Sequence, residues 1–303
     1  MLVHLKNTTK KLCVIGDPVL HSKSPVIQNA MLSALNLDYV YLAQPIPRDG
    51  THAWLEAAKT AGYVGFNATM PHKTALVPWM DRLDEDAGMY QAVNTVCIKN
   101  DGLYGYNTDG RGFLQMLSDA GLSVRGMRVV VLGAGGAARA VALKLAQQGA
   151  AAVTVCNRTE EKAAALCAAA PDILRPAGFD SASLRSAAGT ADLLVNGTSL
   201  GMGGAGGQFS DFSFLHALPA GVPVCDLIYF PKETELLYQA GRLGHPGLNG
   251  LGMLIHQAIF ALEHFTGITA DRAALRKVAE AALRAEAASQ EPAPKAPKGE
   301  NEA

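Results

Sequence analysis

The chain has 303 residues, of which 49% are hydrophobic and 17% charged, enough for two domains of ordinary size, about 100–200 residues each. Its 26 Lys and Arg residues and 27 Asp and Glu residues leave a net charge of −1, which excludes the strong basic excess typical of nucleic-acid-binding proteins. No run of about 18 apolar residues occurs, so the sequence predicts no membrane-spanning helix.

The first hundred residues alternate between short apolar runs and stretches with helical periodicity. Ser24 followed by Pro25 predicts a helix start, with Ser24 as N-cap and Pro25 as the first helical residue. Strands alternating with helices indicate βαβ units and a mainly parallel sheet. The predicted strands are 12–16, 39–43, 63–67 and 93–98, and the helices are 25–35 and 51–60.

The alternation restarts after residue 110 and predicts a second, doubly wound α/β domain. Its predicted helices are 112–120 and about 137–148, and its strands are 128–132, 153–156, 193–195 and 223–227. From Gly250 an apolar stripe with helical spacing predicts further helix up to residue 262. From residue 287 onward, Pro alternates with charge and no apolar period remains, which predicts a disordered tail.

The cysteines and histidines indicate neither disulfides nor a metal site. The five cysteines form no C-x-x-C pair and have apolar neighbours, as in Val155-Cys156 and Val224-Cys225. The eight histidines are scattered without metal-ligand spacing. The N-terminus lacks the apolar core of a secretory signal, so we expect a soluble, reduced, cytoplasmic protein without a bound metal.

A glycine-rich turn follows the strand 128–132. The segment 133–138 reads G-x-G-x-x-A, in which Gly133 permits a tight bend, Gly135 lets a pyrophosphate approach the backbone and Ala138 keeps helix and strand close. The helix N-terminus attracts the phosphates. An ordinary strand–helix turn is the alternative, but the strand before the motif and the helix after it favour a Rossmann-type dinucleotide-binding domain.

The residues after the next strand predict which dinucleotide binds. An NAD site usually has Asp or Glu at this point, but this chain has Asn157-Arg158-Thr159. Arg158 can bind a 2′-phosphate through charge-assisted hydrogen bonds, and Lys162 adds a second cation. The alternative is an ordinary surface arginine, and Glu160 would soften discrimination against NAD. The position favours NADP.

Polar residues also follow strands of the first domain, at the sheet edge where open α/β sheets bind ligands. They lie in segments 21–24, 67–73, 94–95 and 107–109. A lysine partly shielded from water and oriented by a carboxylate can carry the proton in hydride transfer between an alcohol and a ketone, so Lys73 and Asp109 are a candidate pair. The alternatives are a solvated loop lysine at 73 and helix caps at Asp109 and Ser24.

Taken together, these segments resemble shikimate dehydrogenases over nearly the whole chain, to about residue 270. The segments that carry the resemblance are 15–25 (IGDPVLHSKSP), 65–73 (GFNATMPHK), 92–95 (AVNT), 105–109 (GYNTD), 133–138 (GAGGAA), 157–159 (NRT), 196–199 (NGTS) and 250–254 (GLGML). The resemblance implies NADP-dependent reduction of 3-dehydroshikimate to shikimate in aromatic amino-acid (chorismate) biosynthesis.

The resemblance also implies an architecture and a set of site residues. It implies two α/β domains facing a cleft: a substrate domain over 1–110, an NADP-binding domain over 111–249, helices over 250–286 that return to the first domain, and a tail over 287–303. Lys73 and Asp109 would be catalytic. The substrate would bind Ser22 and Ser24 through its carboxylate and Thr69, Asn94 and Gln257 through its hydroxyls, with Tyr229 nearby. NADP would bind Gly133, Ala134, Gly135, Gly136, Ala137, Ala138, Asn157, Arg158, Thr159, Lys162, Leu227 and Gly250.

Three departures from the family pattern leave alternatives open. The family usually has His at Gln28, Val at Ala68 and Asp at Asn249. Gln also occurs at the first of these positions in the quinate/shikimate branch, so a dual-specificity quinate/shikimate dehydrogenase using NAD or NADP is the second candidate. A catalytically idle dinucleotide-binding regulator is the third, and an intact Lys73–Asp109 pair disfavours it. We expect a monomer or homodimer without nucleic-acid or membrane partners.

Overall fold

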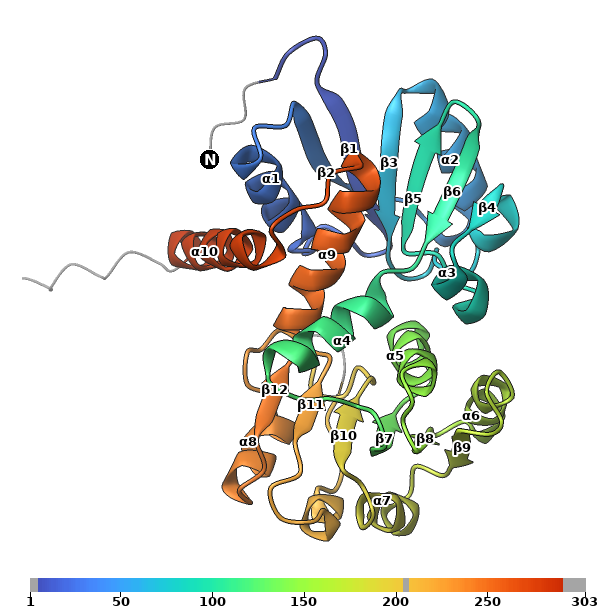
Figure 1. The fold of residues 1–303 in the computed structure, drawn as a ribbon, viewed down its shortest axis with the longest axis vertical. Helices are drawn as coiled ribbons and strands as arrows, with labels where there is room; N and C mark the ends of the chain where they lie inside the picture. Colours follow the sequence, from blue (N-terminus) through green and yellow to red (C-terminus); the bar gives the residue numbers. More distant parts are fainter. Residues whose placement is uncertain (1–4, 204–206, 291–303) are drawn as a thin grey trace, which may run out of the picture.

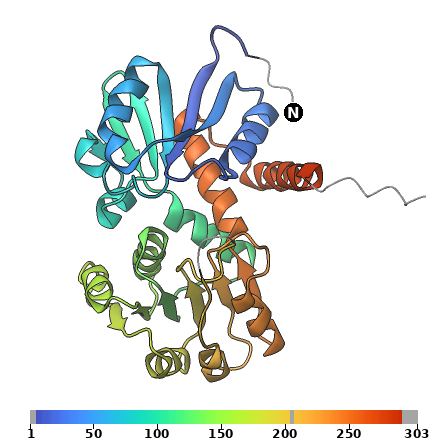
Figure 2. The same ribbon diagram turned by 180° about the vertical axis from the view of Figure 1, so that it is seen from behind.

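Two six-stranded sheets lie one above the other along the long axis of the protein (Figure 1). This computed structural model describes residues 5–203 and 207–290. Two helices, α4 (Asp109–Asp119) and α9 (Leu251–Thr266), pack against each other and join the two halves (Figures 1 and 2). The two-domain α/β fold expected from the sequence is confirmed.

The first sheet has the strand order β2-β1-β3-β5-β6-β4 and is mainly parallel, as predicted. β1, β2 and β3 run parallel and β4 pairs parallel with β6, so β5 is the one strand of this sheet that runs antiparallel to its neighbours β3 and β6. A two-residue hairpin between the paired residues Lys99 and Gly102 reverses the chain after β5. The elements are β1 (Lys10–Gly16), α1 (Ser24–Ala34), β2 (Tyr39–Pro45), α2 (Thr51–Thr60), β3 (Tyr63–Ala68), β4 (Arg82–Leu83), α3 (Glu85–Tyr90), β5 (Thr95–Lys99) and β6 (Gly102–Tyr106), with short 3₁₀ turns at Arg48–Gly50 and Val77–Trp79.

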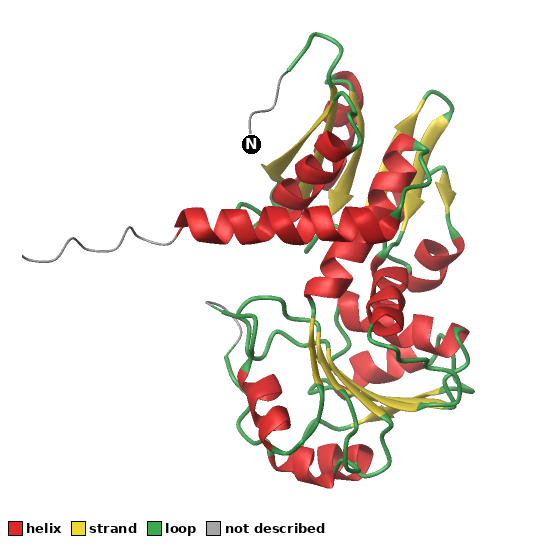
Figure 3. Ribbon diagram, turned by 60° about the vertical axis from the view of Figure 1, so that its left-hand side comes forward, coloured by secondary structure: helices red, strands yellow, loops and turns green. Residues whose placement is uncertain are grey.

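The second sheet is parallel throughout, with the order β12-β11-β10-β7-β8-β9. Helices cover both of its faces (Figure 3), which confirms the doubly wound domain. The strand order reverses between β7 and β10, and ligands bind beyond the strand ends at such a point. The elements are β7 (Arg128–Leu132), α5 (Gly136–Gln147), β8 (Ala152–Cys156), α6 (Glu160–Cys167), β9 (Leu174–Ala177), α7 (Ser181–Ala188), β10 (Leu193–Asn196), a 3₁₀ turn (Ser213–Ala217), β11 (Val224–Asp226), α8 (Glu235–Arg242) and β12 (Gly247–Asn249).

Helix α9 returns the chain to the first sheet. It begins directly after β12, and its buried residues Ile255, Ile259 and Leu262 share a core with Leu12 of β1 and Ile27 of α1. The predicted return of the C-terminal helices is confirmed. Because α9 starts at the strand ends of the second sheet and packs on the first, those strand ends face the first domain (Figure 1).

The last helix, α10 (Arg272–Gln290), lies beside α1 and corrects one boundary. A disordered tail was expected from residue 287, but residues 287–290 continue the helix. Alanine at 287 and 288 has the highest helix propensity, and the Ser289 hydroxyl donates to the Glu286 carbonyl at 2.7 Å. The rest of the expected tail lies outside the described residues. Within residues 5–203 and 207–290, no helix has the length and apolar character to cross a bilayer.

Candidate active site and cofactor cleft

Lys73 and Asp109 lie together although 36 positions separate them in the chain. Lys73 follows β3 and Asp109 begins α4, and the lysine Nζ lies 2.6 Å from Asp109 Oδ2. The side chains are 19% and 8% exposed, so the ion pair is shielded but a ligand can still reach the ammonium. The N-cap residue of α4, Thr108, makes no side-chain cap bond, but the backbone N–H of Asp109 donates to Asn107 Oδ1 at 3.1 Å, which leaves the Asp109 carboxylate available to Lys73. In the described residues, no cluster of His, Cys, Asp and Glu side chains could hold a metal ion.

A buried histidine holds the loop that carries Lys73. His72 is fully buried, with Nδ1 2.8 Å from the Thr51 hydroxyl and Nε2 2.9 Å from the Ile46 carbonyl oxygen. Since a carbonyl can only accept, Nε2 carries a proton, and the Thr51 hydroxyl lies within hydrogen-bonding distance of both Nδ1 and, at 3.2 Å, the Arg48 carbonyl oxygen. The backbone N–H of Val93 also donates to the Lys73 carbonyl at 2.8 Å. The loop is therefore anchored on both sides of the ammonium group.

Asn94 belongs to the same cluster, but its side chain is already fully hydrogen-bonded. Its Nδ2 donates to Thr108 Oγ1 at 2.9 Å and to Asp109 Oδ1 at 2.8 Å. Its Oδ1 accepts from the Thr108 backbone N–H at 3.0 Å and from the Thr95 hydroxyl at 2.8 Å. An amide side chain has two N–H donors, and both are used here. Asn94 therefore fixes the second oxygen of Asp109, and it must share or exchange a bond to contact a ligand.

Ser22 and Ser24 lie at the start of α1, but the predicted cap is wrong. The helix begins at Ser24, one residue before the predicted start, and no cap bond forms from the side chain of the preceding Lys23. Instead, Ser22 Oγ accepts from the Ser24 backbone N–H at 3.2 Å. The tight turn in which the Ser22 N–H donates to the Val19 carbonyl brings Ser22 back over the helix end. Both hydroxyls thus lie at the positive end of α1, where an anion is favoured.

Among the described residues, Thr69, Tyr229 and Gln257 make no hydrogen bond to Lys73 or Asp109. Thr69 follows β3, and a Cβ added to Gly16 would lie 2.5 Å from its Cγ2, so the loops after β1 and β3 are in close contact. Gln257 lies on α9, with Nε2 donating to the Leu254 carbonyl at 2.8 Å. Tyr229 follows β11 in the second domain, and burial raises the pKa of its hydroxyl. These residues come from three separate elements.

The glycine-rich turn after β7 has the geometry of a phosphate loop. Gly133 has φ +99°, which disfavours any side chain, and a Cβ on Gly197 would lie 2.7 Å from Ala138 Cβ. By contrast, a Cβ on Gly135 or Gly136 would meet nothing within 4 Å. The small residues on the sheet side thus bring α5 close to the loop after β10, and the glycines at the helix N-terminus leave space for a ligand. This fits a bound pyrophosphate.

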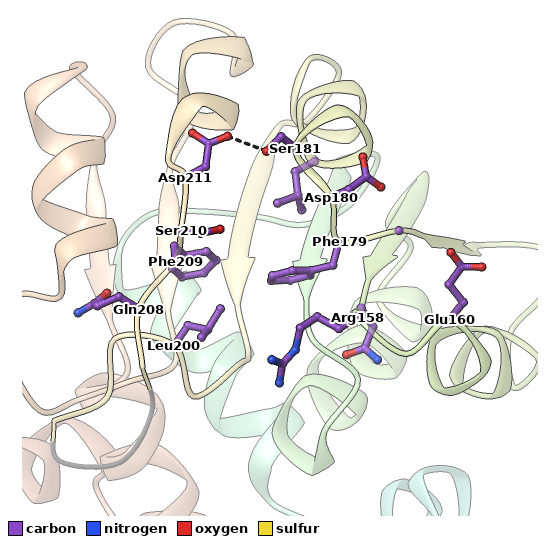
Figure 4. A pocket seen from close by; sticks show the side chains of 13 residues that line it. Arg158, Glu160, Phe179, Asp180, Ser181, Leu200, Gln208, Phe209, Ser210 and Asp211 are labelled. Carbon is purple, nitrogen blue, oxygen red and sulfur yellow. Dashed lines mark hydrogen bonds between the residues drawn. The ribbon is translucent and has the colours of Figure 1, made fainter.

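A cavity of about 450 Å³ lies at the ends of β8, β9 and β10 (Figure 4). Arg158 points into one end of it, and Asp211 lies at the other. Two rings, Phe179 and Phe209, are nearly parallel, with centroids 6.2 Å apart and an interplanar angle of 21°. The lining residues are Asn157, Arg158, Glu160, Gly178, Phe179, Asp180, Ser181, Leu184, Leu200, Gln208, Phe209, Ser210 and Asp211.

The lining of this cavity only partly matches the sequence prediction. Asn157 and Arg158 belong to it, but Lys162 does not line it and is exposed on α6. Asn157 Nδ2 donates to the Thr159 carbonyl at 2.8 Å, so it shapes the turn that presents Arg158. Sequence reasoning missed Phe179 and the segment 208–211, which come from loops after β9 and β10. The sequence signal that could have identified Phe179 is an aromatic residue placed just after a strand of a doubly wound domain.

Gly250 joins β12 to α9 against the backbone of Leu227. A Cβ on Gly250 would overlap the Leu227 carbonyl, so only glycine fits. The Gly250 N–H donates to the Ile228 carbonyl at 3.0 Å. Asp226 is buried just before this loop and accepts from Asn196 Nδ2 at 3.0 Å and from the Thr234 hydroxyl at 2.6 Å. These bonds tie the loops after β10 and β11 together at the strand ends that face the first domain.

Comparison with protein families places matches along most of the chain. The model described as the shikimate dehydrogenase substrate binding domain matches residues 14–96, and the model for shikimate / quinate 5-dehydrogenase matches residues 116–200. The shikimate 5′-dehydrogenase C-terminal domain matches residues 250–280. These three matches lie on the first sheet, the second domain and the two last helices.

Similar proteins carry the same description. The chain is 41% identical to the NADP(+) shikimate dehydrogenase of Geobacter sulfurreducens, over 91% of this chain and 97% of that protein. It is 33% identical to the shikimate 5-dehydrogenase of Thermus thermophilus solved with NADP(H) and shikimate, with a TM-score of 0.79, covering 90% of this chain and 100% of the other. It is also 32% identical to the quinate dehydrogenase of Corynebacterium glutamicum solved with NAD, with a TM-score of 0.80, covering 90% and 99%.

Proposed function

Because this chain belongs to the shikimate dehydrogenase family, we propose that it catalyses the reversible, NADP-dependent reduction of 3-dehydroshikimate to shikimate. The observation that carries the proposal is the shielded Lys73–Asp109 pair, in a chain that also has the open glycine turn of a dinucleotide site. The reaction supplies shikimate to aromatic amino-acid biosynthesis. NADPH, when bound, supplies the hydride to the ketone carbon.

Lys73 manages the proton at the oxygen where the hydroxyl forms. Its ammonium group donates to the substrate oxygen as the ketone is reduced, and in the reverse direction its amine accepts that proton. Asp109 holds Nζ through Oδ2, and Asn94 in turn holds Asp109 through Oδ1. The pair therefore needs little rearrangement during the reaction, and its main contribution is correct positioning.

The other substrate contacts are assigned from family resemblance and supported by their positions. Ser22 and Ser24 bind the carboxylate, and the positive end of α1 adds to the attraction. Thr69, Asn94 and Gln257 bind ring hydroxyls, with Tyr229 approaching from the second domain. In this arrangement the substrate lies on the domain formed by residues 1–110, and NADP lies on residues 111–249.

The cofactor spans the strand ends of the second sheet. The backbone of Gly133–Ala138 binds the pyrophosphate, and Leu227 and Gly250 lie near the nicotinamide. Arg158 and Thr159 bind the 2′-phosphate, with Lys162 as a more distant cation. The cavity between Arg158 and Asp211 takes the adenine, where the ring of Phe179 offers a stacking surface.

The quinate/shikimate alternative now rests chiefly on the similarity to a quinate dehydrogenase. Gln28, which suggested it, is 1% exposed, and its Nε2 donates to the Ala258 carbonyl of α9 at 2.9 Å. The glutamine at position 28 thus serves the packing of α1 on α9. Glu160 lines the same cavity as Arg158, and an acidic residue there softens discrimination against NAD, so this alternative includes some use of NAD.

We propose a cytoplasmic enzyme that acts as a monomer or homodimer. All five cysteines are free and buried, which suits a reducing compartment.

The test combines substrate choice with removal of the proton carrier. Reduced-nicotinamide absorbance is followed with shikimate and quinate, each with NADP⁺ and NAD⁺, for the natural protein, Lys73→Ala and the exposed-site control Lys59→Ala. We expect turnover chiefly with shikimate and NADP⁺, and a loss of kcat of at least about a hundredfold in Lys73→Ala with little change in KM, as for removal of a general acid–base group. Comparable rates with quinate or NAD⁺ would establish the alternative, and a Lys73→Ala variant that keeps its kcat would contradict the role of Lys73.

A further inference from the structure

A continuous line of buried hydrogen bonds connects β2, an edge strand of the first sheet, to Asp109. It starts at Tyr41 on β2, whose hydroxyl lies 2.6 Å from Asn67 Oδ1 on β3. Asn67 Nδ2 lies 2.9 Å from Thr95 Oγ1 on β5, which lies 2.8 Å from Asn94 Oδ1. Asn94 Nδ2 lies 2.8 Å from Asp109 Oδ1. We refer to Tyr41, Asn67, Thr95 and Asn94 as the relay.

The direction of every bond in the relay is determined by backbone groups. Asn67 Nδ2 also donates to the Asn94 carbonyl at 3.0 Å, and a carbonyl can only accept, so Asn67 Oδ1 must face Tyr41 and the Tyr41 hydroxyl must donate. Thr95 Oγ1 accepts a hydrogen bond from Asn67 Nδ2, and its own hydroxyl donates to Asn94 Oδ1. That oxygen also accepts from the Thr108 backbone N–H at 3.0 Å, which leaves Asn94 Nδ2 to donate to Asp109.

The relay is therefore four donors in series, all oriented toward one carboxylate. Hydrogen bonds in such a chain polarise one another, and the effect is stronger where water is excluded. Tyr41 is 1% exposed and Thr95 is fully buried, so water does not compete along the line. Burial also raises the pKa of the Tyr41 hydroxyl well above its ordinary value, which keeps it protonated as a donor.

The fold explains how Tyr41 reaches Asn67 across an intervening strand. β1 lies between β2 and β3, with Leu12 paired to Tyr41 and Val14 paired to Asn67. Leu12 and Val14 are two positions apart and point to the same face of the sheet, so Tyr41 and Asn67 do as well. The tyrosine side chain crosses β1 on that face, within the core that α1 and α9 cover.

We propose that Tyr41 is a positioning residue for the catalytic pair, acting on Asp109 through the relay and stabilising its charged form. This inference rests on the proposed function of Lys73 and Asp109. The charged or titratable groups around Asp109 include Lys73 itself, the Tyr90 hydroxyl of α3, Lys144 of α5 with its ion-pair partner Asp86, and Asp84, which accepts from the Asn107 backbone N–H. None of these belongs to the relay. Removal of the Tyr41 hydroxyl leaves all of them in place.

The experiment compares Tyr41→Phe with Tyr39→Phe, a control two residues earlier on the same strand. The Tyr39 hydroxyl accepts from the exposed Lys10 Nζ at 3.4 Å and takes no part in the relay. kcat and KM are measured with shikimate and NADP⁺. For Tyr41→Phe we expect kcat to fall about three- to tenfold, with KM for shikimate within about twofold, because a positioning residue affects the reacting pair rather than substrate binding. Tyr39→Phe should match the natural protein.

A second pair of variants keeps the proposal testable if Tyr41→Phe folds poorly. Thr95→Val interrupts the relay without changing side-chain shape, and Thr95→Ser restores the hydroxyl. We expect Thr95→Val to reproduce the lower kcat with KM within about twofold, and Thr95→Ser to recover most of the lost kcat. An unchanged kcat in both Tyr41→Phe and Thr95→Val would overturn the inference and leave the relay a purely structural network. If the natural protein fails to turn over shikimate, the proposed function itself fails, which is a distinguishable result.

Discussion

Replacement of Arg158 by glutamine should remove most of the preference for NADP over NAD. Arg158 projects into the cavity after β8, and no ion pair to it is found among the described residues, so its charge is available to a ligand (Figure 4). Hydrogen bonds to a charged group contribute about 1.5–3 kcal/mol each. Because Arg158 is exposed and partly screened by solvent, we count one such bond, which corresponds to an affinity loss of about 10- to 150-fold. NAD⁺ lacks the 2′-phosphate and should lose less than about threefold.

The assay is isothermal titration calorimetry of NADP⁺, NAD⁺ and 2′,5′-ADP on the natural protein, Arg158→Gln and the control Arg125→Gln, an exposed arginine before β7. For the natural protein, NADP⁺ binding should weaken with added salt, and Arg158→Gln should reduce that dependence. Equal weakening of NADP⁺ and NAD⁺ would show that Arg158 contacts the part that both cofactors share. Unchanged NADP⁺ affinity would place the 2′-phosphate elsewhere. Either result refutes the assignment.

Two further predictions concern the adenine and the pH dependence of stability. Stacking of a base on an aromatic ring contributes about 1–3 kcal/mol, so Phe179→Ala should weaken the binding of NADP⁺ and NAD⁺ alike, by about 5- to 150-fold in the same titrations. Phe179→Tyr, which keeps a ring, should leave both affinities unchanged. A loss of affinity for NADP⁺ alone would count against stacking. The ring of His264 stacks on that of Tyr106, with 3.9 Å between the ring centroids. Burial lowers the pKa of His264 from the usual 6.5 to about 4. Below pH 6.5 the unfolded chain therefore binds the extra proton first, and the free energy of unfolding should fall by at most about 1.4 kcal/mol per pH unit down to pH 4. In urea denaturation between pH 4.5 and 7, His264→Phe should flatten this slope, and an unchanged slope would assign it to other groups.

Local signals in the chain predicted most strands and helices, but not every pairing between strands. The strand 128–132 and its glycine turn were correct because a buried apolar run followed by G-x-G-x-x-A has few alternatives. The segment 102–106, in contrast, was missed as a strand, since Gly-Leu-Tyr-Gly-Tyr contains two glycines and looks like a loop. It becomes a strand because it forms a hairpin with β5, so its conformation depends on hydrogen bonds to that strand and not on its own residues alone.

The sequence by itself therefore determined the chemistry that is available: a lysine and an aspartate after strands of one domain, and a phosphate loop followed by an arginine in the other. Only the tertiary structure decided how these groups meet. Helix α4, which packs against α9, carries Asp109, and in the folded protein Asp109 Oδ2 lies 2.6 Å from Lys73 Nζ. The two hydrogen bonds donated by Asn94 Nδ2 likewise depend on where Thr108 and Asp109 lie. The aromatic wall of the cofactor cavity is contributed by loops after different strands. The physical reason is that propensity and hydrophobic period act over a few residues, whereas contacts between distant segments form only when the whole core packs.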